Sequence, residues 1–179
     1  MDKTAIEHWS PVIGGQFWWT GLIFVLIFVP LMIFLGSKIS SKQRDMVLYG
    51  MGIYQLGNKA LTQIGYIFSD NYIMASNLPL HLCGLSGILA GIVVFYRKQI
   101  LFEFLYFFGL VGFIHSVFTP EFTGGVSSWK IFDYYVGHSM LIIIPVWLMK
   151  YYEFRLRHNA WWTSFISVSY THLTLPTML

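Results

Sequence analysis

The sequence predicts an all-α membrane protein, a polytopic bundle of transmembrane helices with five complete helices and the start of a sixth. Three observations predict this fold. Hydrophobic residues make up 56% of the 179 residues and charged residues only 11%, less than half of the charged share of a typical soluble domain. Five apolar segments approach the length of about 20 residues that crosses a membrane. Basic residues cluster in alternate connectors.

Each predicted span has a local reason to begin or end where it does. The first opens with an aromatic trio at Phe17, which is typical of a membrane interface. The second is the most polar. The third opens near Pro79, a residue tolerated in the first turn of a helix, and the fourth ends before Pro120. A sixth helix begins near Ala160. The five spans cover residues 17–35, 46–68, 78–96, 101–118 and 131–149.

The basic residues predict how the helices are oriented. Eight of them lie in the connectors that follow the first, third and fifth spans, against only Lys3 and Lys130 on the other side. Positive charge is enriched in cytoplasmic loops, so we expect the N-terminus outside the cell, in a multi-pass protein of the plasma membrane. The eight residues are Lys38, Lys42, Arg44, Arg97, Lys98, Lys150, Arg155 and Arg157.

The C-terminal tail does not read as membrane protein. We expect residues 1–167 to form the transmembrane domain. Residues 168–179 resemble the translation of a sequencing adapter, so we expect this tail to be non-native and the natural chain to be cut partway through its sixth helix. His172 is therefore excluded from the candidate site.

Several ionisable side chains fall inside the predicted spans, where they are costly and usually line an interior cavity. Counting along the helices at about 1.5 Å per residue places Lys59, His81, Cys83, His115 and His138 in the outer half of the membrane. Taken singly, a buried cysteine or histidine is more often structural. Their gathering in one leaflet predicts a polar cavity that opens outward.

A polar stripe runs along the second span and adds to this cavity. Gln55, Lys59, Thr62 or Gln63, and Tyr66 recur at intervals of three and four residues, which places them on one face of a helix. Lys59 is open to two interpretations. It is a structural lysine that extends toward the interface or pairs with a carboxylate, or it lines the polar cavity.

Short blocks of sequence resemble, in order, the YwaF-like family of bacterial integral membrane proteins. The most specific block is Leu-Pro-Leu-His-Leu-Cys at residues 78–83. It is followed by Phe-Glu at 102–103, Tyr-Phe-Phe-Gly at 106–109, Thr-Pro-Glu at 119–121 and Gly-His-Ser at 137–139. The resemblance covers about residues 15–160. That family is related to a eukaryotic transmembrane acyltransferase that remodels ether phospholipids through a cysteine and a histidine.

The resemblance implies that Cys83 is the nucleophile and His138 its base, in a phospholipid acyltransferase or transacylase that forms a cysteine thioester. His81, Lys59, His115 and Gln63 would support or bind the substrate. We expect phospholipid partners, no nucleic acid, no metal and no cofactor.

Two other functions stay open at this stage. Lys59, together with Glu103 and Asp133 near opposite ends of their helices, also suits a transporter or a proton-coupled permease. Two of the three membrane histidines could instead bind haem.

Overall fold

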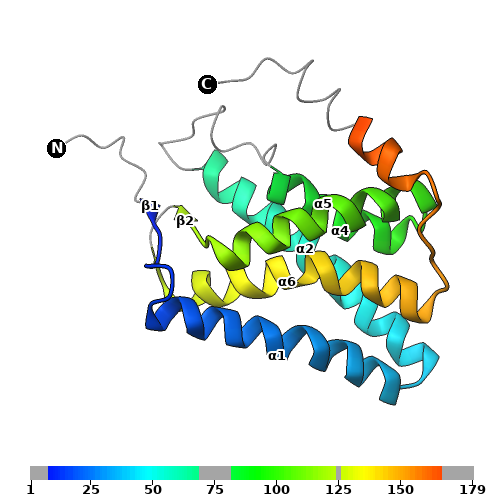
Figure 1. Cartoon of the computed structure of the whole chain (residues 1–179), viewed down its shortest axis with the longest axis horizontal. Coiled ribbons are helices and arrows are strands. Elements are labelled where there is room, and N and C mark those ends of the chain that lie inside the picture. The colour runs from blue at the N-terminus through cyan, green and yellow to red at the C-terminus, as the bar shows by residue number, and fades with distance from the viewer. Residues whose placement is uncertain (1–7, 69–81, 124–125, 167–179) are drawn as a thin grey trace.

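The structure is a computed structural model that describes residues 8–68, 82–123 and 126–166. It is a bundle of helices, as the sequence predicts (Figure 1). The helices are α1 Gln16–Lys38, α2 Ser41–Ile67, α4 Leu82–Phe95, α5 Gln99–Phe118 and α6 Ser128–Tyr151. Residues 160–166 are also helical, where the sequence predicts that a sixth helix begins. Two short strands, β1 His8–Trp9 and β2 Phe122–Thr123, pair antiparallel at one end of the bundle.

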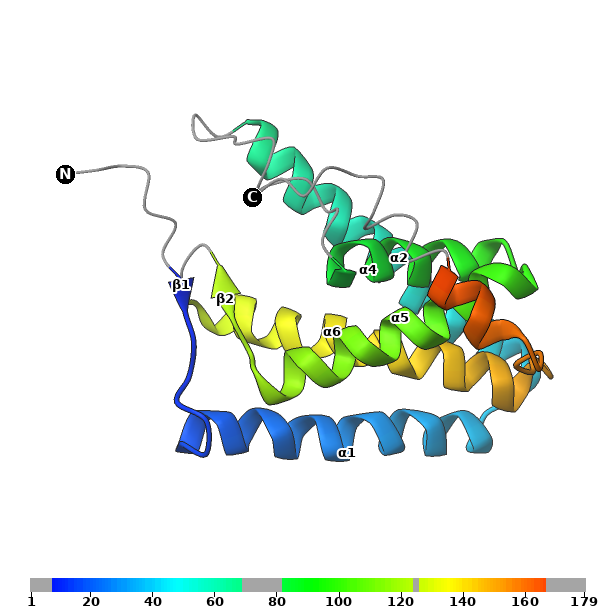
Figure 2. The same ribbon diagram turned by 45° about the horizontal axis from the view of Figure 1, so that its top comes forward.

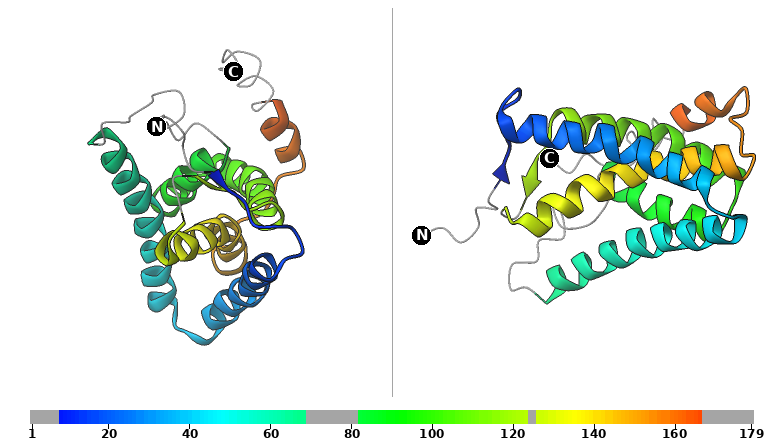
Figure 3. Two further views of the ribbon diagram at one scale, coloured as in Figure 1. Left: turned by 90° about the vertical axis from the view of Figure 1, so that its left-hand side faces the viewer. Right: turned by 90° about the horizontal axis from the view of Figure 1, so that it is seen from below.

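Helix α6 lies at the centre of the bundle. It packs against α1, α2, α4 and α5, and the view along the bundle shows these helices around it (Figure 3). Its outer neighbour α1 runs along one edge (Figure 2). Most of the main hydrophobic core therefore faces α6, where Ile143, Ile144, Trp147 and Leu148 are almost fully buried.

A proline and a glycine allow α5 to approach α6 closely. Pro145 lies inside α6 and has no N–H, so the carbonyl of Leu141 lacks its partner four residues on. Gly109 of α5 packs against this carbonyl, and a Cβ on Gly109 would lie 2.7 Å from the oxygen. Small residues at such crossings let membrane helices pack backbone to backbone.

Three helices, α1, α5 and α6, are long and apolar enough to cross a membrane. They match three of the five predicted spans. Helix α2 carries the polar stripe, and the described part of α4 is shorter, with 14 residues. That these two helices also span the membrane stays a prediction. The tail at residues 168–179 lies outside the described residues.

The predicted basic connectors meet at one end of the bundle. Asp45, at the start of α2, forms an ion pair with Arg97 and accepts a hydrogen bond from the hydroxyl of Tyr152 at 2.6 Å. The Tyr152 and Arg97 contacts hold the pKa of Asp45 below its ordinary value of 3.8. Arg44 lies over the ring of Tyr151. The segments after α1, α4 and α6 are thus joined directly.

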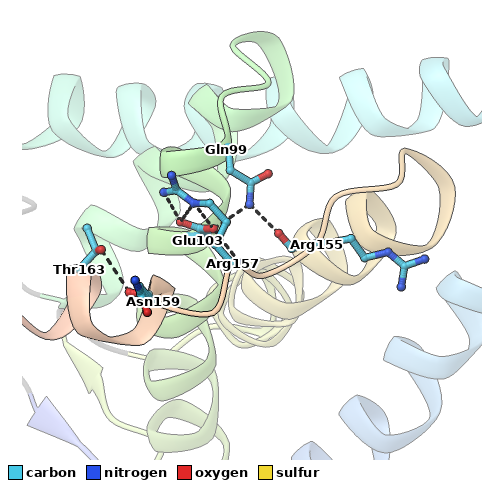
Figure 4. Close-up of polar contacts among 6 residues, drawn as sticks. All are labelled: Gln99, Glu103, Arg155, Arg157, Asn159 and Thr163. Atoms are coloured by element: carbon cyan, nitrogen blue, oxygen red, sulfur yellow. Dashed lines mark hydrogen bonds and ion pairs between the residues drawn. The ribbon is translucent and has the colours of Figure 1, made fainter.

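A buried carboxylate fixes the segment after α6 at the same end. Glu103 of α5 has a side chain that is 1% exposed, and Arg157 donates to it from its guanidinium and its backbone N–H. Gln99 donates both to Glu103 and to the carbonyl of Arg155, whose own side chain points away (Figure 4). Charged hydrogen bonds of this kind are the strong ones. Glu103 is therefore a structural anchor at this end of the bundle.

Candidate functional site

Cys83 lies in the first turn of α4, against α5. Its side chain is partly buried, and its Sγ lies 3.9 Å from the carbonyl oxygen of Gly112, to which the thiol donates. A Cβ on Gly112 would be 3.4 Å from the sulfur, at ordinary van der Waals contact. The same Cβ position lies 3.7 Å from the side chain of Leu141 on α6. Cys83 is therefore placed beside both α5 and α6.

Lys59 of α2 extends toward α4, one helical turn after Cys83. Its side chain is partly buried and lies against Gly87, where a Cβ would be 2.8 Å from Cε of the lysine. The ammonium interacts electrostatically with Asp133 and with Cys83. The lysine is thus directed into the bundle, and the polar cavity itself stays a prediction.

Asp133 of α6 is the acidic partner in this region. Its Oδ1 accepts a hydrogen bond from the hydroxyl of Tyr54 at 2.5 Å, and Asn58 donates to Oδ1 at 2.7 Å and to Oδ2 at 2.8 Å. Tyr54 and Asn58 are one turn apart on α2, so they face α6 together. Gln55 of the predicted stripe is buried and donates to the carbonyl of Gly137 at 2.8 Å.

His138 lies one turn after Tyr134 on α6. Its Nδ1 is 2.7 Å from the Tyr134 carbonyl oxygen, and the two rings pack with centroids 4.3 Å apart. A carbonyl can only accept, so Nδ1 carries the hydrogen, and in the neutral ring Nε2 then carries the lone pair. Tyr134 also interacts electrostatically with Cys83. Cys83 is thus within electrostatic reach of Tyr134, one turn before His138 on α6. Its proximity to His138 itself stays a prediction.

Two of the remaining predicted site residues lie farther from this cluster, and one lies outside the described residues. His115 lies near the C-terminal end of α5 with an exposed side chain. Gln63 is partly buried one turn beyond Lys59 on α2, whereas Thr62 is exposed. His81 lies outside the described residues. Their roles at the site stay predictions.

Four residues of this region were not assigned to the site from the sequence. Tyr54 and Asn58 were missed although they repeat at a spacing of four on α2, and Asp133 was assigned only to the transporter alternative. Tyr134 was missed as well. The signal for Tyr54 and Asn58 is the same helical periodicity that identifies the stripe, because each directly precedes a residue of the stripe, Gln55 or Lys59. Tyr134 had no sequence signal of its own.

Ser86 adds a buried polar atom close to Cys83. It lies three residues after Cys83 on α4, so the two side chains share a face of the helix. Ser86 is fully buried, and its hydroxyl has no hydrogen-bond partner within the described part of the chain. A hydroxyl in this position can donate to a group that binds near the sulfur.

Among the described residues, no three histidine, cysteine or acidic side chains group in a way that could hold a metal ion. A pocket between α1 and α6 is almost wholly apolar and lies on the face of α6 that carries Tyr135, away from Asp133. The pocket lining is Phe17, Thr20, Gly21, Phe24, Ser128, Ile131, Phe132 and Tyr135.

The fold and the polar cluster between its helices define a helical integral membrane protein with ionisable groups inside the bundle. The chain belongs to the TMEM164 family, a family of transmembrane proteins whose model matches residues 7–177. The match includes most of the tail, whose origin stays a prediction. Neither the curated proteins nor the solved structures gave a match to this chain.

Proposed function

We propose that this membrane protein is a phospholipid acyltransferase or transacylase that works through a thioester on Cys83. The observation that carries the proposal is the placement of Cys83 beside Gly112 of α5, on a helix that packs against α6, and within electrostatic reach of Lys59. A thiol near a cation and an imidazole has the elements of an activated nucleophile. The resemblance to the YwaF-like proteins supports the same pair.

In the first half of the reaction, Nε2 of His138 takes the proton of the Cys83 thiol. The thiolate attacks the carbonyl carbon of a phospholipid ester, so a C–S bond forms. The ester C–O bond then breaks, and the leaving oxygen takes the proton from His138. The products are a lysophospholipid and an acyl thioester on Cys83.

In the second half, the hydroxyl of a lysolipid attacks the thioester. Its proton passes to Nε2 of His138, a new C–O ester bond forms, and the C–S bond breaks. The thiolate leaves and recovers the proton from His138. Water in place of the lysolipid would make the same site a hydrolase.

Polar groups near the sulfur suit the charge that develops on the substrate. The Ser86 hydroxyl is a donor for the oxyanion of the tetrahedral intermediate, and Lys59 supplies positive charge on the same side of α4. His81, His115 and Gln63 are assigned to binding of the lipid head group. The site faces the outer leaflet of the plasma membrane, with the basic connectors in the cytoplasm.

Acyl exchange in vesicles tests the proposal. The protein is reconstituted with a phospholipid that carries a labelled acyl chain and with an unlabelled lysophospholipid. We expect label to move to the lysophospholipid, and Cys83→Ala and His138→Gln to abolish this transfer. His158→Gln is the matched control, because His158 is exposed after α6, and it should retain full activity. Transfer that continues at the normal rate in Cys83→Ala contradicts the proposal.

A second function is favoured by one observation, the charged groups Lys59 and Asp133 between membrane helices. Such groups also mark ion or substrate pathways in transporters. Uptake of a solute by the same vesicles, lost in Lys59→Ala but unaffected by Cys83→Ala, would support a transporter or proton-coupled permease over the enzyme.

A further inference from the structure

The carboxylate of Asp133 is held in one position by α2. Tyr54 and Asn58 together give it three hydrogen bonds of 2.5 to 2.8 Å, and both donors come from one face of α2. A carboxylate bound at both oxygens has little freedom to rotate. The carboxylate is therefore fixed within electrostatic reach of Lys59, the residue that follows Asn58 in the chain.

Lys59 extends from α2 across to α4, and the surface of α4 is shaped for it. Gly87 has no side chain where Cε of the lysine lies, and even a methyl group would come within 2.8 Å of that atom. Gly87 is one turn after Cys83 on the same helix. The lysine ammonium thus interacts with the Asp133 carboxylate and with the Cys83 thiol.

An unpaired ammonium group between membrane helices is costly, and so is an unpaired thiolate. A nearby carboxylate reduces the cost of burying the ammonium, and the ammonium in turn reduces the cost of burying a thiolate. The three groups are therefore coupled. Asp133 offsets part of the cost of burying the Lys59 ammonium while Cys83 is a neutral thiol, and Lys59 then faces the thiolate when the proton has left.

We propose that Asp133 is a positioning residue that acts through Lys59: it holds the Lys59 ammonium toward Cys83, so that Lys59 is the counter-ion of the Cys83 thiolate. This inference rests on the proposed function, because it assigns the source of the nucleophile's reactivity. Lys59 transfers no proton in the reaction. The proton of the thiol goes to His138, as in the scheme above.

Other titratable groups also lie near Cys83. The helices packed against α4 are α2, α5 and α6. At this level they carry Lys59 on α2, His115 on α5, and Asp133, Tyr134 and His138 on α6. The side chain of His115 is exposed, and Tyr134 and His138 remain in every variant used below. A change between variants therefore reports the Lys59 and Asp133 charges.

Alkylation of Cys83 tests the inference without lipid turnover. The chain has one cysteine, so N-ethylmaleimide added to the protein in vesicles reports on this thiol alone. The rate is measured from pH 6 to pH 10 in the wild type and in Lys59→Met, Lys59→Arg and Asp133→Asn. Lys42→Met, at an exposed position near the start of the same helix, is the matched control.

We expect Lys59→Met and Asp133→Asn to lower the alkylation rate at pH 7 by about tenfold or more, because a nearby opposite charge is worth roughly one unit or more of pKa. Lys59→Arg, which keeps the charge, should stay close to wild type, and Lys42→Met should equal it. The midpoint of the rate against pH should move to higher pH while the plateau at high pH is retained. A purely structural role would lower the plateau and leave the midpoint in place.

Tyr54→Phe provides a milder variant in case Asp133→Asn does not fold. It removes one of the three hydrogen bonds to Asp133 and should move the midpoint in the same direction by a smaller amount. Midpoints in Lys59→Met and Tyr54→Phe that coincide with the wild type overturn the inference. If acyl exchange is then still observed, the proposed function survives alone. Shifted midpoints without any acyl exchange support the charge coupling and contradict the proposed enzyme.

Discussion

Gly109→Ala is expected to weaken the contact between α5 and α6. A methyl group at this position would lie 2.7 Å from the carbonyl oxygen of Leu141, about 0.7 Å short of ordinary van der Waals contact at 3.4 Å. The oxygen belongs to the backbone of the central helix, so no side-chain rotation can relieve the overlap. The two helices must move apart or the backbone must deform.

The cost of this overlap can be separated from the effect of alanine itself. Overpacking of a well-packed interface costs about 1–3 kcal/mol, whereas alanine stabilises a helix over glycine by up to about 1 kcal/mol. Gly57→Ala on α2 is the matched control, because nothing lies within 4 Å of the added methyl group. Both variants gain the higher helix propensity of alanine, so this gain cancels in the comparison. Gly109→Ala should therefore be less stable than Gly57→Ala by about 1–3 kcal/mol.

The assay is the free energy of unfolding of the two variants in the same detergent or bicelle, measured by denaturant titration or by steric trapping. Activity of Gly109→Ala should fall as well, since α5 also carries the Gly112 carbonyl that receives the Cys83 thiol. Equal stability of the two variants, within about 0.5 kcal/mol, would refute the close packing of α5 on α6 described here.

Two further predictions concern the candidate site and the opposite end of the bundle. Gly87→Ala should push Lys59 aside, because the flexible lysine yields before the backbone does; alkylation of the single cysteine should slow several-fold with little loss of thermal stability, and an unchanged rate would contradict the placement of the lysine. Arg157→Met should lower the melting temperature by depriving the buried Glu103 carboxylate of its guanidinium, whereas Arg155→Met, which alters a side chain that points away (Figure 4), should melt like the wild type.

The helices could be predicted from the sequence because each one is local. Apolar runs and the positions of Pro79 and Pro120 place them within a few residues, and α1, α5 and α6 are confirmed as long and apolar enough to cross a membrane. The basic connectors could be paired at one end for the same reason. Charge alternation depends only on the order of segments along the chain.

The partners inside the bundle could not be predicted because they are set by how the helices rotate about their axes. Lys59 could be assigned to a polar face, but the hydrogen bonds from Tyr54 and Asn58 to Asp133 join residues 79 and 75 positions apart. Neither apolar length nor charge alternation specifies that rotation. It depends on which small residues leave room for a neighbouring group, as Gly87 does for the side chain of Lys59.

The acyl-enzyme itself tests the central claim most directly. Protein in vesicles of a phospholipid with one defined acyl chain is quenched in acid within seconds, digested and analysed by mass spectrometry. We predict a single acylated peptide, the one that contains Cys83. Neutral hydroxylamine should release its acyl group, as expected of a thioester. This hydroxylamine-labile acyl group should be absent in Cys83→Ser. Acyl transfer to a lysolipid without any acylated Cys83 peptide, or an acyl group on another residue, would contradict this account.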